Sequence, residues 1–312
     1  MIPPRLQQGD TIGFVSPSKN LDEARKEKLK STFHVLEHDF GLRIKLGKHA
    51  YATHIYGESA GSPEQKAEDI NSMFSDRDVK AIWCTVGGDT ANDVLDLLDY
   101  GLIKKNPKIF MGLSDITVLL NALYHKTGLV TFHNGDPRSE PEYETFADDY
   151  SQQQFKKRLM DGAVGPIDKN SEWRSVRQGA AEGTILGGNL SSILKLAGTP
   201  YLPDFKGAIL LLEGFRPDPS EVQCKLTHLR QMGVFSAIAG VVIGFMYSFQ
   251  KDPKYTIQFE DIVRDVTANY DFPIIKINEF GHKCPNTPLP IGGRGRMDAG
   301  ALRFEIASQC VD

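Results

Sequence analysis

Short apolar runs alternate with amphipathic stretches along the first half of the chain. Runs of strand length occupy residues 11–15, 42–46, 79–86, 108–111 and 129–133. Helical patterns lie between them at residues 21–38, 90–98 and 115–124. A further helix begins at Ser62, because Ser62, Pro63 and Gln65 supply an N-cap, a first-turn proline and a capping-box partner. Strands separated by helices predict a parallel, doubly wound α/β domain.

The pattern changes after this domain. Between residues 135 and 177 charged residues, prolines and glycines dominate, which predicts a linker or lid with one polar helix near residues 149–159. Further strands are predicted at residues 208–212, 240–245, 273–277 and 302–306, and helices at 220–232 and 260–270. We therefore expect an N-terminal domain over residues 1–160, a linker or lid over 161–180, and a C-terminal domain over 181–312.

Composition narrows the class of protein. The chain has 312 residues, 40% hydrophobic content and a formal net charge of -4, as in ordinary soluble proteins, and its scattered basic residues do not suggest nucleic-acid binding. The first residues lack the apolar segment of a secretory signal, and no apolar run approaches membrane-spanning length, so we expect a cytoplasmic protein without a membrane partner. The four cysteines show no C-x-x-C spacing, so neither a zinc site nor a disulfide framework is indicated.

Ser114 is the strongest candidate for chemistry. The apolar strand at residues 108–111 breaks at Gly112, presents Ser114, and continues into an amphipathic helix. A serine on such a tight strand-to-helix turn projects its hydroxyl beside the free N–H groups that open the helix, as a nucleophile requires. The alternative is that Ser114 is only a helix N-cap.

A glycine pair follows an earlier strand. Gly87 and Gly88 leave the strand that ends at Val86, and ligands of parallel sheets bind at such carboxyl ends. Paired glycines let the backbone approach an oxyanion or a phosphate closely, although they can also serve the turn alone.

Two further residues could complete a serine hydrolase site. Glu213 ends an all-apolar strand, where a rigidly held carboxylate can orient an imidazole, or it can be an ordinary turn acid. His282 lies in a loop rich in glycine and proline, from which it can reach a cleft between domains. Among the other histidines, His133 at a strand end is the main rival.

These motifs, in this order, resemble the LD-carboxypeptidase family of serine peptidases (peptidase family S66). The resemblance rests on Gly-x-Ser-Asp-x-Thr at Ser114, the Gly-Gly-Asp-Thr loop, Gly-Thr-Ile-Leu-Gly-Gly-Asn-Leu from Gly183, Leu-Glu-Gly at Glu213, and Gly281-His282. It implies Ser114 as nucleophile, His282 as general base and Glu213 as its orienting acid, without a metal or other cofactor. It also implies an oxyanion hole from the backbone of Asp115, Gly87 and Gly88.

The resemblance extends to architecture and partners. It implies a Rossmann-like N-terminal domain, a smaller β-rich α/β C-terminal domain and a homodimer. The family includes muramoyltetrapeptide carboxypeptidases and microcin C immunity proteins, so the expected partner is a small peptide or a peptidyl-nucleotide. The Glu172-Trp173 pair resembles the immunity-like branch, in which a tryptophan can stack on a nucleobase, although a lone tryptophan is more often a packing anchor.

Substrate-binding residues are less well defined than the catalytic ones. We consider Trp173, Asn189 and Arg216 as candidates. A carboxypeptidase must recognise a terminal carboxylate, for which arginine is the natural bidentate partner. The arginines considered, without ranking, are Arg138, Arg216, Arg294 and Arg296.

The preferred interpretation is a metal-independent serine carboxypeptidase acting on murein-type peptides. The first alternative is an immunity-like amidase that cleaves aminoacyl-nucleotide peptides. A nucleotide-binding protein, with the loop at Gly87 as its phosphate cradle, is the alternative from another class, although no Walker lysine accompanies that loop. An inactive scaffold is disfavoured because all three triad residue types are present.

Overall fold

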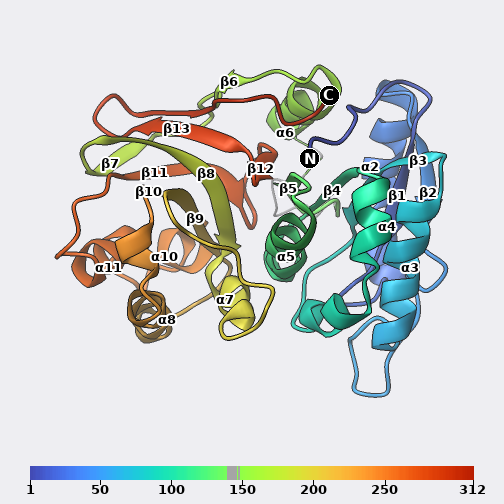
Figure 1. Cartoon of the computed structure of the whole chain (residues 1–312), viewed down its shortest axis with the longest axis horizontal. Helices are drawn as coiled ribbons and strands as arrows, with labels where there is room; N and C mark the ends of the chain where they lie inside the picture. Colours follow the sequence, from blue (N-terminus) through green and yellow to red (C-terminus); the bar gives the residue numbers. More distant parts are fainter. Residues whose placement is uncertain (139–145, 147) are drawn as a thin grey trace.

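Two β-sheets lie side by side in the computed structural model, which describes residues 1–138, 146 and 148–312 (Figure 1). Part of the segment predicted as a linker or lid, residues 139–145 and 147, lies outside the described residues. In the described part of the chain, no helix combines the length and the apolar character needed to cross a membrane.

The first sheet has the order β12-β5-β4-β3-β1-β2. Its strands are β1 (Thr11–Val15), β2 (Arg43–Leu46), β3 (Val79–Cys84), β4 (Ile109–Gly112), β5 (Thr131–His133) and β12 (Leu289–Ile291). The strands β1 to β5 pair in parallel, which confirms the predicted parallel α/β domain, and only β12 is antiparallel. Because β3 and β4 are neighbours, the glycine pair and the Ser114 turn leave the same edge of the sheet.

Helices connect these strands, with two departures from the prediction: an unpredicted helix at Tyr100–Lys105 and a break within residues 21–38. They are α1 (Glu23–Glu27), α2 (Lys30–His34), the π-helix η1 (Val35–Asp39), α3 (Pro63–Ser75), α4 (Tyr100–Lys105), α5 (Thr117–Thr127), and the 3-10 helices η2 (Ala91–Leu97) and η3 (Ser114–Ile116). The capping box at Ser62 is confirmed. The single helix predicted over residues 21–38 is instead broken between α1 and α2, where buried Leu29 packs with Leu21 and Ala50 in a small separate cluster.

The second sheet has the order β6-β14-β13-β8-β9-β10-β11-β7. Its strands are β6 (Gly165–Pro166), β7 (Arg174–Arg177), β8 (Ala180–Asn189), β9 (Ala208–Gly214), β10 (Gly240–Met246), β11 (Ile274–Gly281), β13 (Arg294–Asp298) and β14 (Arg303–Ile306). Strands β8 to β11 are parallel and the others antiparallel. The remaining helices are α6 (Asp149–Phe155), α7 (Leu190–Ile193), α8 (Pro219–Gln231), α9 (Val234–Ala237), α10 (Tyr247–Lys251), α11 (Phe259–Val266), η4 (Lys156–Met160) and η5 (Leu194–Leu196).

Strands cross the domain boundaries that the sequence suggests. β12 belongs by sequence to the C-terminal part, yet it pairs with β5 of the first sheet. β6 and β7 lie within the predicted linker, yet they pair with β14 and β11 of the second sheet. Which strands pair through their backbones depends little on side-chain type. The hydrophobic pattern therefore did not indicate that β12 joins the first sheet or that β6 and β7 join the second. The boundaries at residues 160 and 181 remain predictions.

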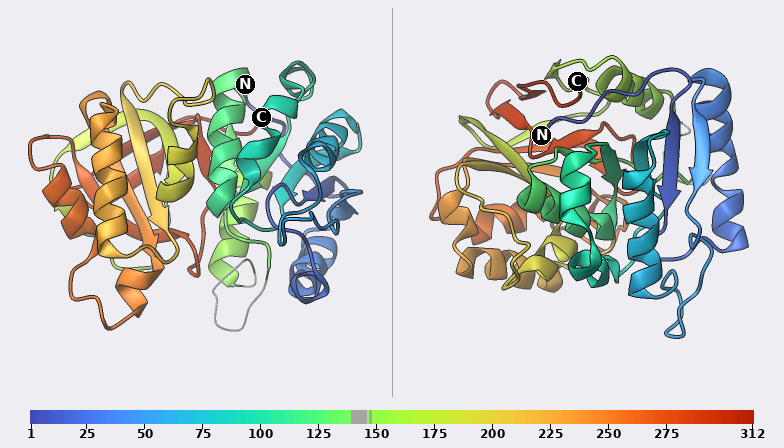
Figure 2. Two further views of the ribbon diagram at one scale, coloured as in Figure 1. Left: turned by 90° about the horizontal axis from the view of Figure 1, so that it is seen from below. Right: turned by 45° about the vertical axis from the view of Figure 1, so that its right-hand side comes forward.

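Helix α5 joins the two halves (Figure 2). The Asn121 side chain donates to Gly187 O at 2.9 Å and accepts from Gly187 N at 3.0 Å, which ties α5 to β8. One turn earlier, Thr117 Oγ1 accepts from Asn189 N at 3.0 Å. A single hydrophobic core continues through both sheets. The start of α5, which carries the Ser114 turn, is therefore fixed against the end of β8.

Candidate active site

Ser114 occupies a strained backbone position. It follows β4 and has a φ of 65°, in the left-handed region that residues with a side chain rarely adopt. Such a conformation costs about 1–3 kcal/mol and is concentrated at functional sites. The cost would be unnecessary for a simple N-cap, whose backbone is extended. The geometry is that of a sharp elbow presenting a hydroxyl.

The glycine pair lies directly against this elbow. A Cβ added to Gly87 would come within 2.6 Å of Ser114 Cβ and 2.9 Å of Ser114 Oγ, and one added to Gly88 would come within 2.4 Å of Ser18 Oγ. Gly88 also has a φ of 151°. Glycine is therefore required at residue 87 for the close approach to Ser114, and at residue 88 for the backbone conformation and the close approach to Ser18.

The carboxylate of Asp115 fastens three segments behind the elbow. Asp115 is fully buried, and its Oδ2 accepts from Ser18 Oγ at 2.7 Å and from Ala91 N at 2.8 Å. Its Oδ1 pairs with Lys195 Nζ at 2.5 Å, and the same ammonium donates to Asp89 O at 2.9 Å. Lys195 comes from η5, in the other half of the molecule. This ion pair therefore locks the elbow, the glycine loop and the second half together.

Glu213 and His282 form a close pair. Glu213 lies in β9, and His282 follows β11, which runs to Gly281 rather than ending near residue 277 as predicted. Glu213 Oε2 lies 2.6 Å from His282 Nδ1. A proton on Nδ1 is then shared with the carboxylate, which leaves Nε2 with a lone pair able to accept a proton.

Asn189 holds the other oxygen of Glu213. It ends β8 opposite Glu213, and its Nδ2 donates to Glu213 Oε1 at 3.0 Å. Its Oδ1 accepts from the backbone N of Ser191 and of Ser192, both at 3.1 Å. Both ends of the amide are thus engaged by the protein. The geometry makes Asn189 a support for Glu213, and because it also lines the cavity, its role as a substrate contact stays a prediction.

The environment keeps Glu213 ionised. Burial by itself raises the pKa of Glu213, but the attraction of His282 and the nearby His133 outweighs it, so the pKa lies well below its ordinary value. A carboxylate that stays charged can stabilise a protonated imidazole beside it.

His133, the rival histidine, lies on the far side of the same carboxylate. It is fully buried, and its Nε2 is 3.9 Å from Glu213 Oε1, too long for a hydrogen bond. Within the described part of the chain, neither of its ring nitrogens has a hydrogen-bond partner. His133 does not line the cavity that contains Ser114.

That cavity has a volume of about 450 Å³ and brings most of the predicted site residues together. The predicted residues that line it are Ser114, His282, Gly87, Gly88, Asn189, Arg216 and Arg138. Glu213 lies behind His282. Trp173, Arg294 and Arg296 are not among the lining residues.

The structure discriminates among the candidate arginines. Arg294 and Arg296 bind Glu182 on the surface, at 3.0 Å each. Arg138 lines the cavity but its guanidinium is held by Asp136, with Nε 2.9 Å from Oδ1. Arg216 stacks over Phe215 at 4.9 Å and pairs with no carboxylate among the described residues. Among these four candidates, Arg216 is therefore the arginine whose positive charge is available to pair with a carboxylate of a substrate.

An aromatic shelf supports both His282 and Arg216. The Phe215 ring stacks on His282, with centroids 5.1 Å apart, and also contacts Tyr247 at 5.5 Å. Arg216 and Lys283 both lie over these two rings. Sequence reasoning missed Phe215 and Tyr247, because stacking between distant segments leaves no local pattern.

Trp173 is a packing residue in this structure. It is 4% exposed, and its indole N–H donates to buried Glu279 at 2.7 Å. The other oxygen of Glu279 accepts from Asn170 N and Ser171 Oγ, each at 2.8 Å. The tryptophan thus anchors the segment before β7, and the structure does not bring it to the cavity.

Comparisons with known proteins identify relatives over nearly the whole chain. Residues 12–134 match the family model of the LD-carboxypeptidase N-terminal domain, and residues 182–297 match that of the C-terminal domain. A probable murein peptide carboxypeptidase of Bacillus subtilis (strain 168) is 31% identical, over 95% of this chain and 91% of its own. The crystal structure of an MccF-like protein from Bacillus anthracis str. Ames superimposes with a TM-score of 0.85 at 31% identity, covering 98% of each chain.

A further solved structure is similar in fold alone. The microcin C7 self-immunity protein MccF, in complex with aspartyl sulfamoyl adenosine, superimposes with a TM-score of 0.89 at 24% identity and covers 100% of each chain.

Proposed function

Since the chain belongs to the LD-carboxypeptidase family and is a peptidase, we propose that it is a serine carboxypeptidase with Ser114 as nucleophile, His282 as general base and Glu213 as the orienting acid. The observation that carries this proposal is the 2.6 Å contact between Glu213 and His282, beside a cavity that His282 shares with the strained Ser114.

Each group has a defined task in the reaction. His282 Nε2 accepts the Ser114 proton as the hydroxyl attacks the amide carbonyl, and returns it to the leaving amine. Glu213 holds the imidazole by Nδ1 and balances its charge, while Asn189 fixes the carboxylate from the other side. Water then hydrolyses the acyl-enzyme by the same proton transfers in reverse.

The oxyanion hole follows from the position of the glycine loop. We propose that backbone N–H groups of Gly87, Gly88 and Asp115 stabilise the tetrahedral oxyanion, because this loop contacts Ser114 directly. Removal of one such donor typically costs about 3–4 kcal/mol of transition-state stabilisation. The ion pair of Asp115 with Lys195 keeps the donors in place.

Arg216 is the proposed receptor for the terminal carboxylate. It lines the cavity, it shares the Phe215 shelf with His282, and its guanidinium has no carboxylate partner among the described residues. The leaving residue of a carboxypeptidase substrate carries both the amine that His282 protonates and the carboxylate. The leaving amine and the terminal carboxylate would then be bound on the same side of Ser114.

We propose murein-type peptides as the substrate class, in line with the relative from Bacillus subtilis. The test is a mass-spectrometric assay of the purified protein with an L,D-tetrapeptide, combined with labelling by a fluorophosphonate. Release of the terminal residue and labelling at Ser114 are expected. An unlabelled, inactive protein would overturn the serine mechanism.

A second candidate function is supported by the MccF-like structure at 31% identity. An aspartyl-sulfamoyl-adenosine amide in the same assay distinguishes the two, because an immunity-like amidase would cleave it in preference to the tetrapeptide. A thermal shift with ATP and magnesium, without labelling of Ser114, would instead favour the nucleotide-binding alternative.

We further propose that the protein is a cytoplasmic homodimer, as the family resemblance implies. Light scattering during size-exclusion chromatography and fractionation of the producing cells test the two statements separately.

A further inference from the structure

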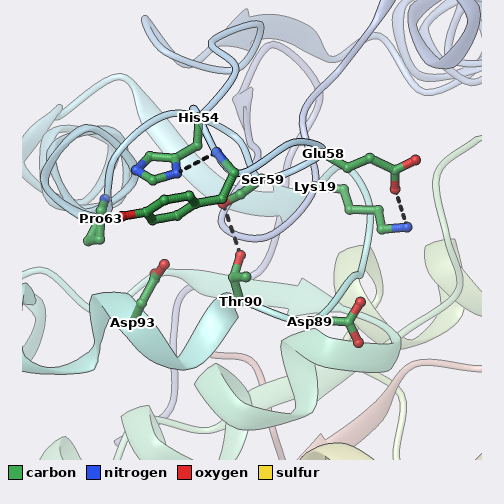
Figure 3. A pocket seen from close by; sticks show the side chains of 9 residues that line it. Lys19, His54, Glu58, Ser59, Pro63, Asp89, Thr90 and Asp93 are labelled. Carbon is green, nitrogen blue, oxygen red and sulfur yellow. Dashed lines mark hydrogen bonds and ion pairs between the residues drawn. The ribbon is translucent and has the colours of Figure 1, made fainter.

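A second cavity adjoins the proposed active site. It has a volume of about 450 Å³, within the range of small-molecule binding sites. Lys19 and Asp89 line both cavities, so the two cavities are adjacent at this pair of residues. Figure 3 shows Asp93, Thr90 and Asp89 along one side of the second cavity, with His54 and Ser59 opposite.

Hydrogen bonds and ion pairs hold the walls of this cavity firmly. Lys66, with a side chain 1% exposed, binds Asp93 Oδ2 at 2.7 Å, Thr90 Oγ1 at 3.1 Å and Ser59 Oγ at 3.2 Å. Lys19 forms an ion pair with Glu58. The charges of these lysines are thus balanced within the protein, so the second cavity does not resemble a phosphate-binding site.

Ring surfaces cover the side of the cavity on which His54 lies. His54 and Tyr56 contact each other, with centroids 4.5 Å apart, and Pro63 lies beside them. Tyr56 is 85% exposed and Ile55 is 88% exposed, although large hydrophobic side chains are usually covered. The loop therefore offers apolar contact surface that nothing in the described part of the chain uses.

In the cavity lined by Ser114 and His282, the proposed reaction sets the direction in which a substrate crosses the cavity. The leaving amine must lie on the His282 side, and the terminal carboxylate beside it on Arg216. The acyl part then extends from Ser114 in the other direction, along the Gly87-Gly88 loop. Asp89 is the next residue of that loop, and it opens into the second cavity.

We propose that the second cavity binds the peptide segment on the amino side of the scissile bond, with the rings of His54 and Tyr56 contacting its side chains. This inference rests on the proposed function, because the orientation follows from the roles of His282 and Arg216. Binding in the second cavity makes the enzyme selective for peptides that extend several residues on the amino side of the bond that it cleaves. Binding energy from remote residues of a substrate can be expressed as a higher kcat/KM.

The test is a length series of acyl-side extensions with the same terminal residue, from dipeptide to pentapeptide. In the wild-type enzyme kcat/KM should rise at least about 10-fold along the series. Tyr56→Ala should remove most of that rise while the dipeptide rate stays unchanged. Because Tyr56 is so exposed, this substitution should not disturb folding. Tyr51→Ala, at another exposed tyrosine that does not line the cavity, is the matched control and should keep the full rise.

The outcomes separate the inference from the function on which it rests. Equal kcat/KM for all lengths, or an equal loss for short and long peptides in Tyr56→Ala, would overturn the second cavity as a subsite while leaving the carboxypeptidase proposal intact. Failure to cleave any peptide, together with no fluorophosphonate labelling, would instead remove the proposed function.

Discussion

Glu213 Oε2 lies 2.6 Å from His282 Nδ1, although the two residues are separated by 69 positions in the chain. The contact depends on β9 and β11 belonging to one sheet, while Ser114 follows β4 of the other sheet. The site is thus complete only where the two sheets meet.

Ser114→Ala should reduce kcat/KM by about 10³-fold or more, as removal of a triad member does elsewhere. Ser114→Gly should be equally inactive but as stable as wild type or more stable, because glycine adopts a φ of 65° without strain. Urea unfolding and peptide hydrolysis measure the two effects. The control is Ser191→Ala, a hydroxyl of the same cavity bound to Lys225. A Ser114→Ala rate above about 1% of wild type would exclude this nucleophile.

His282→Ala should be nearly as damaging as Ser114→Ala, and the double variant scarcely worse, because triad members act as a unit. His133→Ala should cost much less, since His133 is 3.9 Å from Glu213 and does not line the cavity. The measurement is the hydrolysis rate of one verified peptide by Ser114→Ala, His282→Ala, the double variant and His133→Ala. An inactive His133→Ala beside an active His282→Ala would reverse the assignment.

Arg216→Ala should raise KM for a peptide with a free terminal carboxylate about 10- to 100-fold, as expected from loss of a charged hydrogen bond. The same peptide with a terminal amide should be a poor substrate for wild type and little affected by the substitution. Arg296→Ala, whose guanidinium binds Glu182 away from the cavity, provides the control. A similar loss on both peptides would indicate a structural role.

Glu213 should make the free energy of unfolding depend on pH in the acidic range. Its pKa is lower in the folded protein than in the unfolded chain, where a glutamate titrates at about 4.3, so the unfolded state binds the extra proton. The contribution is fully present above that value and is lost as the pH falls toward the folded-state pKa. Between about pH 5 and 2, the free energy of unfolding should therefore fall less steeply in Glu213→Gln than in wild type. Identical slopes would contradict the shift.

Lys195→Met should destabilise the protein by about 1–2 kcal/mol, because it leaves a buried oxygen of Asp115 without its cation. The estimate is moderate because the Lys195 side chain is 25% exposed. Lys156→Met, which breaks an exposed pair with Asp161, should cost less than about 0.5 kcal/mol. Denaturant titration of both variants measures the difference. Equal stabilities would mean that Asp115 does not depend on its ion pair.

The sequence predicted features that have a local physical cause. The elbow at Ser114, the capping box at Ser62 and the apolar strands each follow from neighbouring residues, and the structure contains them. Sequence reasoning did not reveal the ion pair of Lys195 with Asp115 or the hydrogen bond from Asn189 to Glu213. These contacts join residues 80 and 24 positions apart. They exist only after the sheets pack, so no spacing in the chain marks them.

The pairing of β12 with β5 limits how the protein can be divided. A fragment that ended before β12 would leave β5 as an open edge, with unpaired backbone groups able to capture strands from other molecules. The remaining fragment would carry β12 without the strand it pairs with. Each half expressed alone should therefore tend to aggregate, whereas the two expressed together could recombine into one particle. Although its N-terminal and C-terminal parts match separate family models, the chain should unfold in a single cooperative transition.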